Sequence, residues 1–202
     1  VAGLQAIATA KRLGAVVEAT DLRPTAKEQV ESLGGKWLDV PMSPEEQARA
    51  DEAAKNGYGW TPGEQYIKDQ AAIVDKAVSN ADIVITTALL PGRNAPRLIK
   101  AETVAKMKPG SVILDMAVET GGNVEGSKVG ETVFTENGVK ILGVPNIPST
   151  LSTEASALYA RNVFNFVETL FDADKNFSIN PEEEIQKALL VTHGGQVLLK
   201  RG

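Results

Sequence analysis

An acidic residue that follows a short β-branched stretch is the first feature of this sequence that could do chemistry. Residues 1–21 read VAGLQAIATAKRLGAVVEATD, in which a stretch rich in small residues ends at Gly14 and Asp21 comes soon after a pair of valines. In a dinucleotide-binding βαβ unit, a glycine-rich turn opens the helix and an acid about 20 residues further on binds ribose hydroxyls. With Gly3 as the third glycine of that turn, Asp21 stands 18 positions later, which suits this role.

The other parts of such a unit also have physical roles. A glycine at position 3 lets the helix pack closely on a sheet, and the N–H groups and positive dipole end of the helix N-terminus favour a pyrophosphate. The first strand and the two leading glycines would lie upstream of Val1. Because only half of the motif is present, ordinary α/β packing is an alternative explanation of the same residues.

The nucleotide that Asp21 would select depends on its charge. A carboxylate at this position accepts hydrogen bonds from both hydroxyls of an adenosine ribose and repels a 2′-phosphate. Arg23, two residues further on, argues instead for NADP(H). Because Asp21 lies closer to the expected position of the acid, we predict NAD(H) as the cofactor.

Loops at the ends of predicted strands are rich in Gly, Pro, Asn and Thr. They span residues 21–24, 86–93, 115–123 and 144–150. In open α/β sheets, ligands bind outside the carboxyl ends of the strands, where such loops meet. Loops that connect strands to helices often have this composition, but four of them in sequence favour a binding site.

The remaining candidates for chemistry receive structural interpretations. His193 is the only histidine and lies far in sequence from these loops, so we interpret it as structural. Asp115 and Glu119 are spaced like an acid pair, and we predict that they orient the Gly121-Gly122-Asn123 loop. The sequence shows no metal-ligand spacing, and we predict neither a catalytic side chain nor a metal site.

Strands and helices alternate up to residue 143, a pattern typical of an α/β fold with a Rossmann-type, doubly wound parallel sheet. Capping boxes are expected at Thr25–Glu28 and at Ser43–Glu46. The segment 56–63, NGYGWTPG, reads as a flexible loop with two exposed aromatic residues. The helices are expected at 25–34, 43–56, 64–79 and 95–107, and the later strands at 36–40, 83–87, 111–115, 132–135 and 139–143.

The C-terminal part breaks this alternation. Residues 152–171 predict a long amphipathic helix with its apolar side chains directed inward, namely Leu158, Val163, Phe164, Val167 and Leu170. A short helix capped at 180–183 and two strands at 189–192 and 196–199 follow. We therefore predict a nucleotide-binding domain over residues 1–150. Residues 151–202 are expected to form a connecting helix and the C-terminal portion of a second, largely missing α/β domain.

Composition narrows the functional classes. The chain of 202 residues has a net charge of −5, which argues against nucleic acid as a partner. It contains no cysteine, which fits a reducing compartment. No apolar run reaches the ~18–20 residues of a membrane span.

The strand-end motifs together resemble a known family. VAGLQAIATAKRLGA with ATDLRP, ITTALLPGRNAP, MKPGSVILDMAVETGGN and GVPNIPS are similar to the NAD(H)-binding alpha subunit (domain I) of proton-translocating NAD(P) transhydrogenase. The resemblance covers nearly all of residues 1–172. It implies that Tyr58 belongs to a mobile loop that closes on the nucleotide. It also implies a cofactor site lined by Val1, Gly3, Asp21, Leu22, Thr87, Ala88, Leu89 and Asn146.

The resemblance also implies an activity and partners. The chain would pass hydride between NAD(H) and NADP(H) bound on a partner, with membrane-spanning subunits coupling the transfer to proton translocation, and it would form a homodimer. It would lie at the cytoplasmic face of a bacterial inner membrane, or on the matrix side in a mitochondrion. Alanine dehydrogenase is a related family, and an amino-acid dehydrogenase is the alternative activity. A module that senses NAD(H) without catalysis is a third hypothesis.

Overall fold

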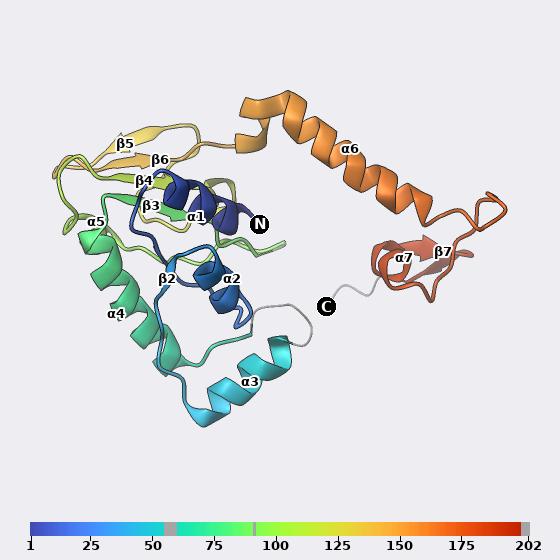
Figure 1. The fold of residues 1–202 in the computed structure, drawn as a ribbon, viewed down its shortest axis with the longest axis horizontal. Helices are drawn as coiled ribbons and strands as arrows, with labels where there is room; N and C mark the ends of the chain where they lie inside the picture. Colours follow the sequence, from blue (N-terminus) through green and yellow to red (C-terminus); the bar gives the residue numbers. More distant parts are fainter. Residues whose placement is uncertain (55–59, 91, 199–202) are drawn as a thin grey trace. The chain divides into compact units, whose positions relative to one another are not determined.

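The computed structural model describes residues 1–54, 60–90 and 92–198 (Figure 1). The chain divides into two compact units, Val1–Pro145 and Asn146–Gly202. The boundary expected at residue 150 and the boundary between the two units at residue 145 lie close together in the sequence.

The first unit is built on two groups of strands. β1 (Glu18–Ala19) pairs in parallel with β2 (Lys36–Trp37). A four-stranded sheet has the order β3-β4-β6-β5 and consists of β3 (Ile83–Thr86), β4 (Val112–Asp115), β6 (Lys140–Leu142) and β5 (Thr132–Phe134). β5 runs antiparallel to β6 because a tight turn that ends at Gly138, with φ +81°, joins them directly. The sheet is therefore mixed, with an antiparallel edge strand on a parallel core.

Helices cover one face of the four-stranded sheet and form the main core with it. Val78 of α4 (Glu64–Asn80) and Val104 of α5 (Ala101–Val104) pack with Ile113 and Ile141 from the two central strands. Two side chains on the opposite face of β3 are exposed. Ile83 is 69% exposed and Ile85 is 42% exposed, so the strand predicted at 83–87 is present but is buried on one face only. Successive side chains of a strand point to opposite faces, and only the face of Val84 is covered by this core.

The first helices differ in how they begin. α1 (Ala2–Arg12) ends near Gly14, as expected. α3 (Pro44–Ala54) has the predicted capping box, in which Ser43 Oγ accepts from the Glu46 N–H and Glu46 Oε2 accepts from the Ser43 N–H, both at 3.2 Å. α2 (Ala26–Ser32) lacks a side-chain cap from Thr25, so that predicted capping box is wrong. The Thr25 backbone is already helical, with φ −64° and ψ −19°, whereas a capping residue has an extended backbone.

The helix predicted over 95–107 is much shorter in the structure, where only α5 is helical. The preceding residues instead run beside the loop that follows β4: the Leu98 N–H donates to Asn123 O at 2.8 Å, and Ile99 forms a parallel bridge with Val124. Because Pro96 has no N–H group, it also favours a non-helical segment here.

A second apolar cluster lies between α3 and α4. Ala50, Trp60 and Tyr66 are its buried members, and Leu22 and Met42 pack against them. Trp60 is only 6% exposed and meets Tyr66 edge to face at 4.9 Å between ring centroids. The expectation that this tryptophan is exposed is therefore wrong. Tyr58, the other aromatic residue of that segment, lies outside the described residues.

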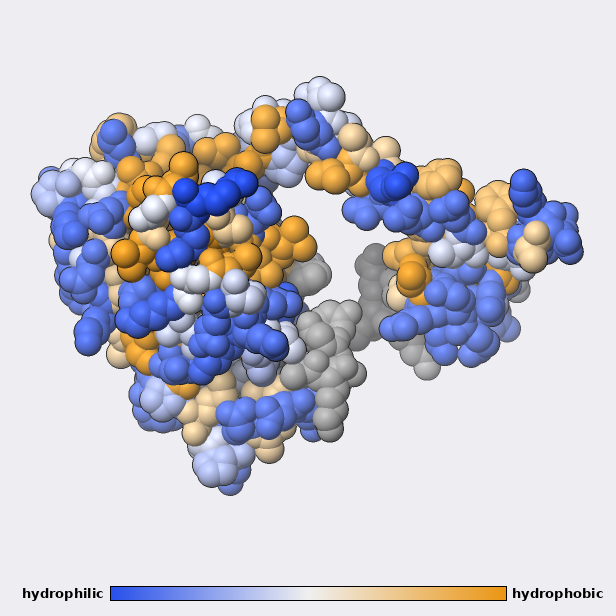
Figure 2. Space-filling model, viewed as in Figure 1, coloured by the Kyte–Doolittle hydropathy of each residue, from blue (hydrophilic) through white to orange (hydrophobic). Residues whose placement is uncertain are grey.

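The second unit contains η2 (Ile147–Leu151), α6 (Ser152–Glu168), α7 (Glu184–Leu189) and a hairpin of β7 (Thr192–His193) with β8 (Gln196–Val197). The Glu183 carboxylate accepts from the Gln186 N–H and caps α7. No residue of α6 is buried, and apolar residues lie on its surface (Figure 2). Four of the side chains predicted to point inward are therefore exposed, namely Leu158, Val163, Phe164 and Val167. Leu170, the fifth, follows the helix and is half-buried. In the part of the chain that the structure describes, no helix is long and apolar enough to cross a membrane.

Candidate nucleotide-binding site

The beginning of α1 meets the loop after β3. A Cβ atom placed on Gly3 would lie 3.3 Å from Thr87 Oγ1, so a larger residue at position 3 would require the Thr87 side chain to shift. Val1, at the N-cap position, provides no side-chain cap to the helix. The first N–H groups of α1 therefore lie beside Thr87 at the carboxyl end of a strand, where an anionic group is favoured by the helix dipole.

Asn123 holds Ala88, the residue after Thr87 in the loop that follows β3. Its Oδ1 accepts from the Ala88 N–H at 3.1 Å, and its Nδ2 donates to Ala88 O at 3.0 Å. Nδ2 also donates to Pro96 O at 2.8 Å, and the Asn123 side chain is fully buried. The amide thus connects the loop after β3 with the loop after β4.

Asp115, the last residue of β4, organises the loop that contains Asn123. Its Oδ1 accepts from the N–H groups of Ala117 at 3.0 Å and Asn123 at 3.2 Å, and its Oδ2 accepts from Val124 N–H at 3.1 Å. The side chain of Asp115 is fully buried. The expectation that Asp115 orients the Gly121-Gly122-Asn123 loop agrees with these contacts.

Gly122 is required by the same arrangement. Its φ is +77°, and a Cβ atom at this position would lie 2.6 Å from Asp115 Oδ2. Any larger residue would displace the carboxylate that holds the loop. Glu119 is exposed on η1 (Val118–Thr120). This short helix precedes Gly121, whereas Asn123 follows it.

Asp21 follows β1 and is paired with Arg23. Arg23 Nη2 donates to Asp21 Oδ2 at 2.9 Å, and Arg23 Nε donates to Oδ1 at 3.1 Å. The Arg23 N–H also donates to Oδ1 at 2.8 Å. The hydrogen bonds and charge of Asp21 raise the pKa of the Arg23 guanidinium. The Asp21 and Arg23 side chains are 35% and 42% exposed, so solvent reaches the pair.

Leu22 anchors this loop on the second apolar cluster, against Trp60 and Tyr66. Burial raises the pKa of the Tyr66 hydroxyl, and the negative charges of Glu46 and Asp21 raise it further. The Asp21 loop therefore packs, through Leu22, on buried aromatic side chains.

The structure places the other predicted site residues as follows. Leu89 is 56% exposed in the loop after β3. Asn146 begins the second unit with a left-handed backbone, φ 44°, and Tyr58 lies outside the described residues. His193 is exposed in β7. Within residues 1–54, 60–90 and 92–198, no group of three or more His, Cys, Asp or Glu side chains is arranged to hold a metal ion.

Sequence reasoning missed one residue that positions these loops. Arg97 donates from Nη1 to Val124 O and from Nη2 to Gly121 O at 3.1 Å, so it secures the far side of the loop after β4. No sequence spacing points to this contact, because 24 residues separate Arg97 from Gly121.

The fold and the convergent loops define a Rossmann-type α/β domain, as predicted. The model of the family described as "Alanine dehydrogenase/PNT, C-terminal domain" matches residues 1–200, and the chain belongs to this family. The resemblance identified from the strand-end motifs is confirmed.

The relatives named transhydrogenase are more similar to this chain than the relative named alanine dehydrogenase. A protein of Rhodospirillum rubrum named as the first part of the alpha subunit of NAD(P) transhydrogenase is 49% identical over 98% of this chain and 50% of its own length. A solved structure of transhydrogenase from Sinorhizobium meliloti is 46% identical, with a TM-score of 0.73 over 97% of this chain and 49% of that chain. "Alanine dehydrogenase 1" of Staphylococcus aureus is 28% identical over 63% of this chain and 35% of its own length. The chain thus spans about half the length of the first two of these relatives.

Proposed function

We propose that this chain binds NAD(H) and is the nucleotide-binding component of a proton-translocating NAD(P) transhydrogenase. The observation that carries the activity is the identity of 49% to a transhydrogenase subunit over 98% of the chain. The identity of 28% to an alanine dehydrogenase covers only 63% of the chain. The more extensive similarity supports transhydrogenation over amino-acid oxidation.

The arrangement of loops supports the NAD(H) site. Gly3 lets the N-terminus of α1 lie close to Thr87, where the helix dipole favours a nucleotide phosphate, and Asp21 offers a partly exposed carboxylate to the ribose hydroxyls. Thr87, Ala88 and Leu89 would line the site from the loop after β3. Val1 and Leu22 are proposed to complete it within the first unit. The assignment of Asn146 and Tyr58 to the nucleotide site stays a prediction of the family resemblance.

The chemistry that the nicotinamide supplies is hydride donation and acceptance at a ring carbon. Transfer between two nicotinamides moves no proton at the reacting carbons, so the protein has to orient and desolvate the ring rather than act as acid or base. The loops after β3 and β4 suit this task because the buried Asn123 and Asp115 hold their backbones in place.

The domains and partners follow from the same proposal. Residues 1–150 form the nucleotide-binding domain, and residues 151–202 form the connecting helix and part of a companion α/β domain. The partners are NADP(H)-binding and membrane-spanning subunits, with the protein as a peripheral homodimer on the cytoplasmic or matrix side.

Substitution of Asp21 tests the nucleotide site. In the full-length protein, Asp21→Asn should weaken NADH binding about tenfold, because it removes a charged acceptor worth ~1.5–3 kcal/mol. Fluorescence titration measures the dissociation constant. Equal affinity of the wild type for NADH and NADPH would contradict the assignment of Asp21.

Assays with the partner test the activity. Reduction of an NADP analogue by NADH in the presence of the NADP(H)-binding partner supports transhydrogenation. Alanine-dependent reduction of NAD would favour the dehydrogenase alternative, and NADH binding with neither reaction would favour a sensing module.

A further inference from the structure

The side chain of Arg23 occupies acceptor positions that a ribose would need. A carboxylate has about four acceptor positions, two on each oxygen. Asp21 Oδ1 receives two donors, the Arg23 N–H and Nε, and Oδ2 receives Nη2. In this state one position remains, on Oδ2. A ribose diol presents two hydroxyls and needs two positions.

Release of the guanidinium restores the missing acceptor. The hydrogen bond from the Arg23 N–H to Oδ1 at 2.8 Å belongs to the backbone and stays. Oδ1 then regains one position and Oδ2 has two, which suffices for both hydroxyls. The carboxylate also keeps its orientation, because the backbone bond continues to hold it.

We propose that Arg23 is a specificity-determining residue that competes with the ribose diol for Asp21 and lowers the preference for NAD(H) over NADP(H). This inference rests on the proposed NAD(H) site at Asp21. When NADH binds, the guanidinium leaves the carboxylate and returns to solvent. When a nucleotide with a 2′-phosphate binds, the guanidinium pairs with the phosphate and offsets the repulsion from Asp21.

Because the ion pair of Asp21 and Arg23 is partly exposed, separating the two side chains costs little free energy. Asp21 and Arg23 side chains are 35% and 42% exposed, and partly exposed ion pairs are held weakly. Leu22, between them, is fixed on the apolar cluster of Trp60 and Tyr66. The guanidinium can therefore move while the backbone of the loop stays in place.

The experiment measures dissociation constants of NADH and NADPH in the full-length protein by fluorescence titration. Arg23→Ala should tighten NADH binding about two- to fivefold, since it removes a competitor held by a weak pair. It should weaken NADPH binding about tenfold, since a charged donor to the phosphate is lost. Arg23→Lys keeps the charge but cannot make the two-pronged contact, so NADPH affinity should be largely retained and NADH affinity should rise.

Lys27→Ala is the charge-matched control. It also removes one positive charge from an exposed ion pair, with Asp39 at 2.8 Å, and should change both affinities by less than about twofold. Weaker NADH binding in Arg23→Ala, or equal changes for both nucleotides, would overturn the inference while Asp21→Asn still weakens NADH binding. If Asp21→Asn leaves NADH affinity unchanged, both the inference and the proposed site at Asp21 are wrong.

Discussion

Asn123 binds both backbone groups of Ala88, accepting from its N–H at 3.1 Å and donating to its C=O at 3.0 Å across 35 residues of sequence. This pair of bonds fixes the direction of the loop after β3. Because each backbone group of Ala88 is satisfied by the same buried amide, the loop cannot rotate without leaving polar atoms unpaired.

Asn123→Asp should therefore disturb nucleotide binding as well as stability. Aspartate has the same shape but lacks the donor that reaches Ala88 O and Pro96 O, which should cost ~1–3 kcal/mol of unfolding free energy. We expect NADH affinity to fall several-fold. Urea denaturation and fluorescence titration measure the two effects.

Asn137→Asp is the matched control for this variant. Asn137 Nδ2 donates to three carbonyl groups, of Val104, Ala105 and Met107, at the opposite end of the sheet's strands from the candidate site. Its replacement should cost a similar free energy of unfolding and leave NADH affinity unchanged. A similar loss of NADH affinity in both variants would show that Asn123 acts through general stability alone.

Gly122→Ala should be more destabilising than Gly130→Ala. Both glycines have a positive φ, +77° and +76°, so both variants have backbone strain. Only at Gly122 does the added Cβ meet a side chain, Asp115 Oδ2 at 2.6 Å, whereas the Gly130 position is open. We expect the Gly122 variant to lose ~1–3 kcal/mol more unfolding free energy, measured in urea. Equal losses would contradict the close contact.

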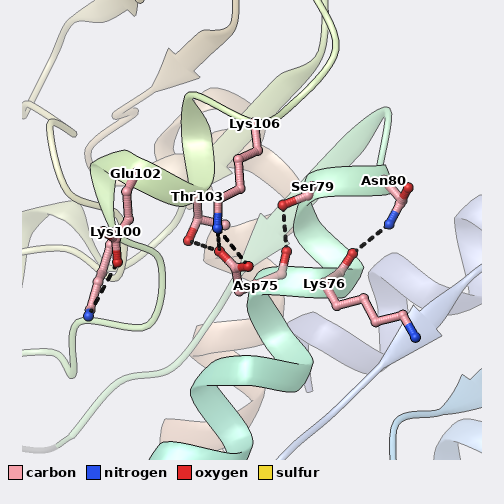
Figure 3. Close-up of polar contacts among 8 residues, drawn as sticks. All are labelled: Asp75, Lys76, Ser79, Asn80, Lys100, Glu102, Thr103 and Lys106. Carbon is pink, nitrogen blue, oxygen red and sulfur yellow. Dashed lines mark hydrogen bonds and ion pairs between the residues drawn. The ribbon is translucent and has the colours of Figure 1, made fainter.

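Asp75 joins α4 to α5 and should make stability depend on pH. Its Oδ1 accepts from Thr103 Oγ1 at 2.6 Å, and Lys106 Nζ contacts both oxygens at 2.9 Å (Figure 3). The hydrogen bond from Thr103 and the contact with Lys106 lower the pKa of Asp75 below its usual 3.8.

A lowered pKa in the folded state means that the ionised form stabilises the fold. This contribution is present above pH 3.8 and is lost as the pH falls through the lower folded-state pKa. Asp75→Asn should therefore destabilise the protein at pH 7, and the difference from wild type should shrink towards about pH 3. Urea midpoints at both pH values provide the measurement, and a constant difference would contradict the role of the charge.

The hydride transfer proposed for this protein should depend little on pH. Measured with the NADP(H)-binding partner in the full-length protein, its rate should be nearly flat between about pH 6 and 8, where a working acid or base would titrate. Glu119→Gln should change binding at most. A bell-shaped profile, or loss of the step in Glu119→Gln with NADH affinity intact, would favour the dehydrogenase alternative.

The features that the sequence alone determined are those that depend on residues close together in the chain. α1 ends near Gly14, Ser43 and Glu46 cap each other three positions apart, and Asp21 follows a strand. Each of these follows from local propensity, capping or spacing, which act over one or two turns of chain. The alternation of strands and helices likewise predicted the Rossmann-type class.

Tertiary structure decided the features that depend on distant partners. Trp60 is buried because α3 and α4 bring Ala50 and Tyr66 to it, and residues 95–100 are not helical because they run beside the loop after β4. Ile85 is exposed because the main core covers the other face of β3, that of Val84. The bonds from Asn123 to Ala88 join segments 35 residues apart. A local pattern fixes which backbone conformation a segment prefers, but burial and polar pairing depend on which surfaces the folded chain brings together.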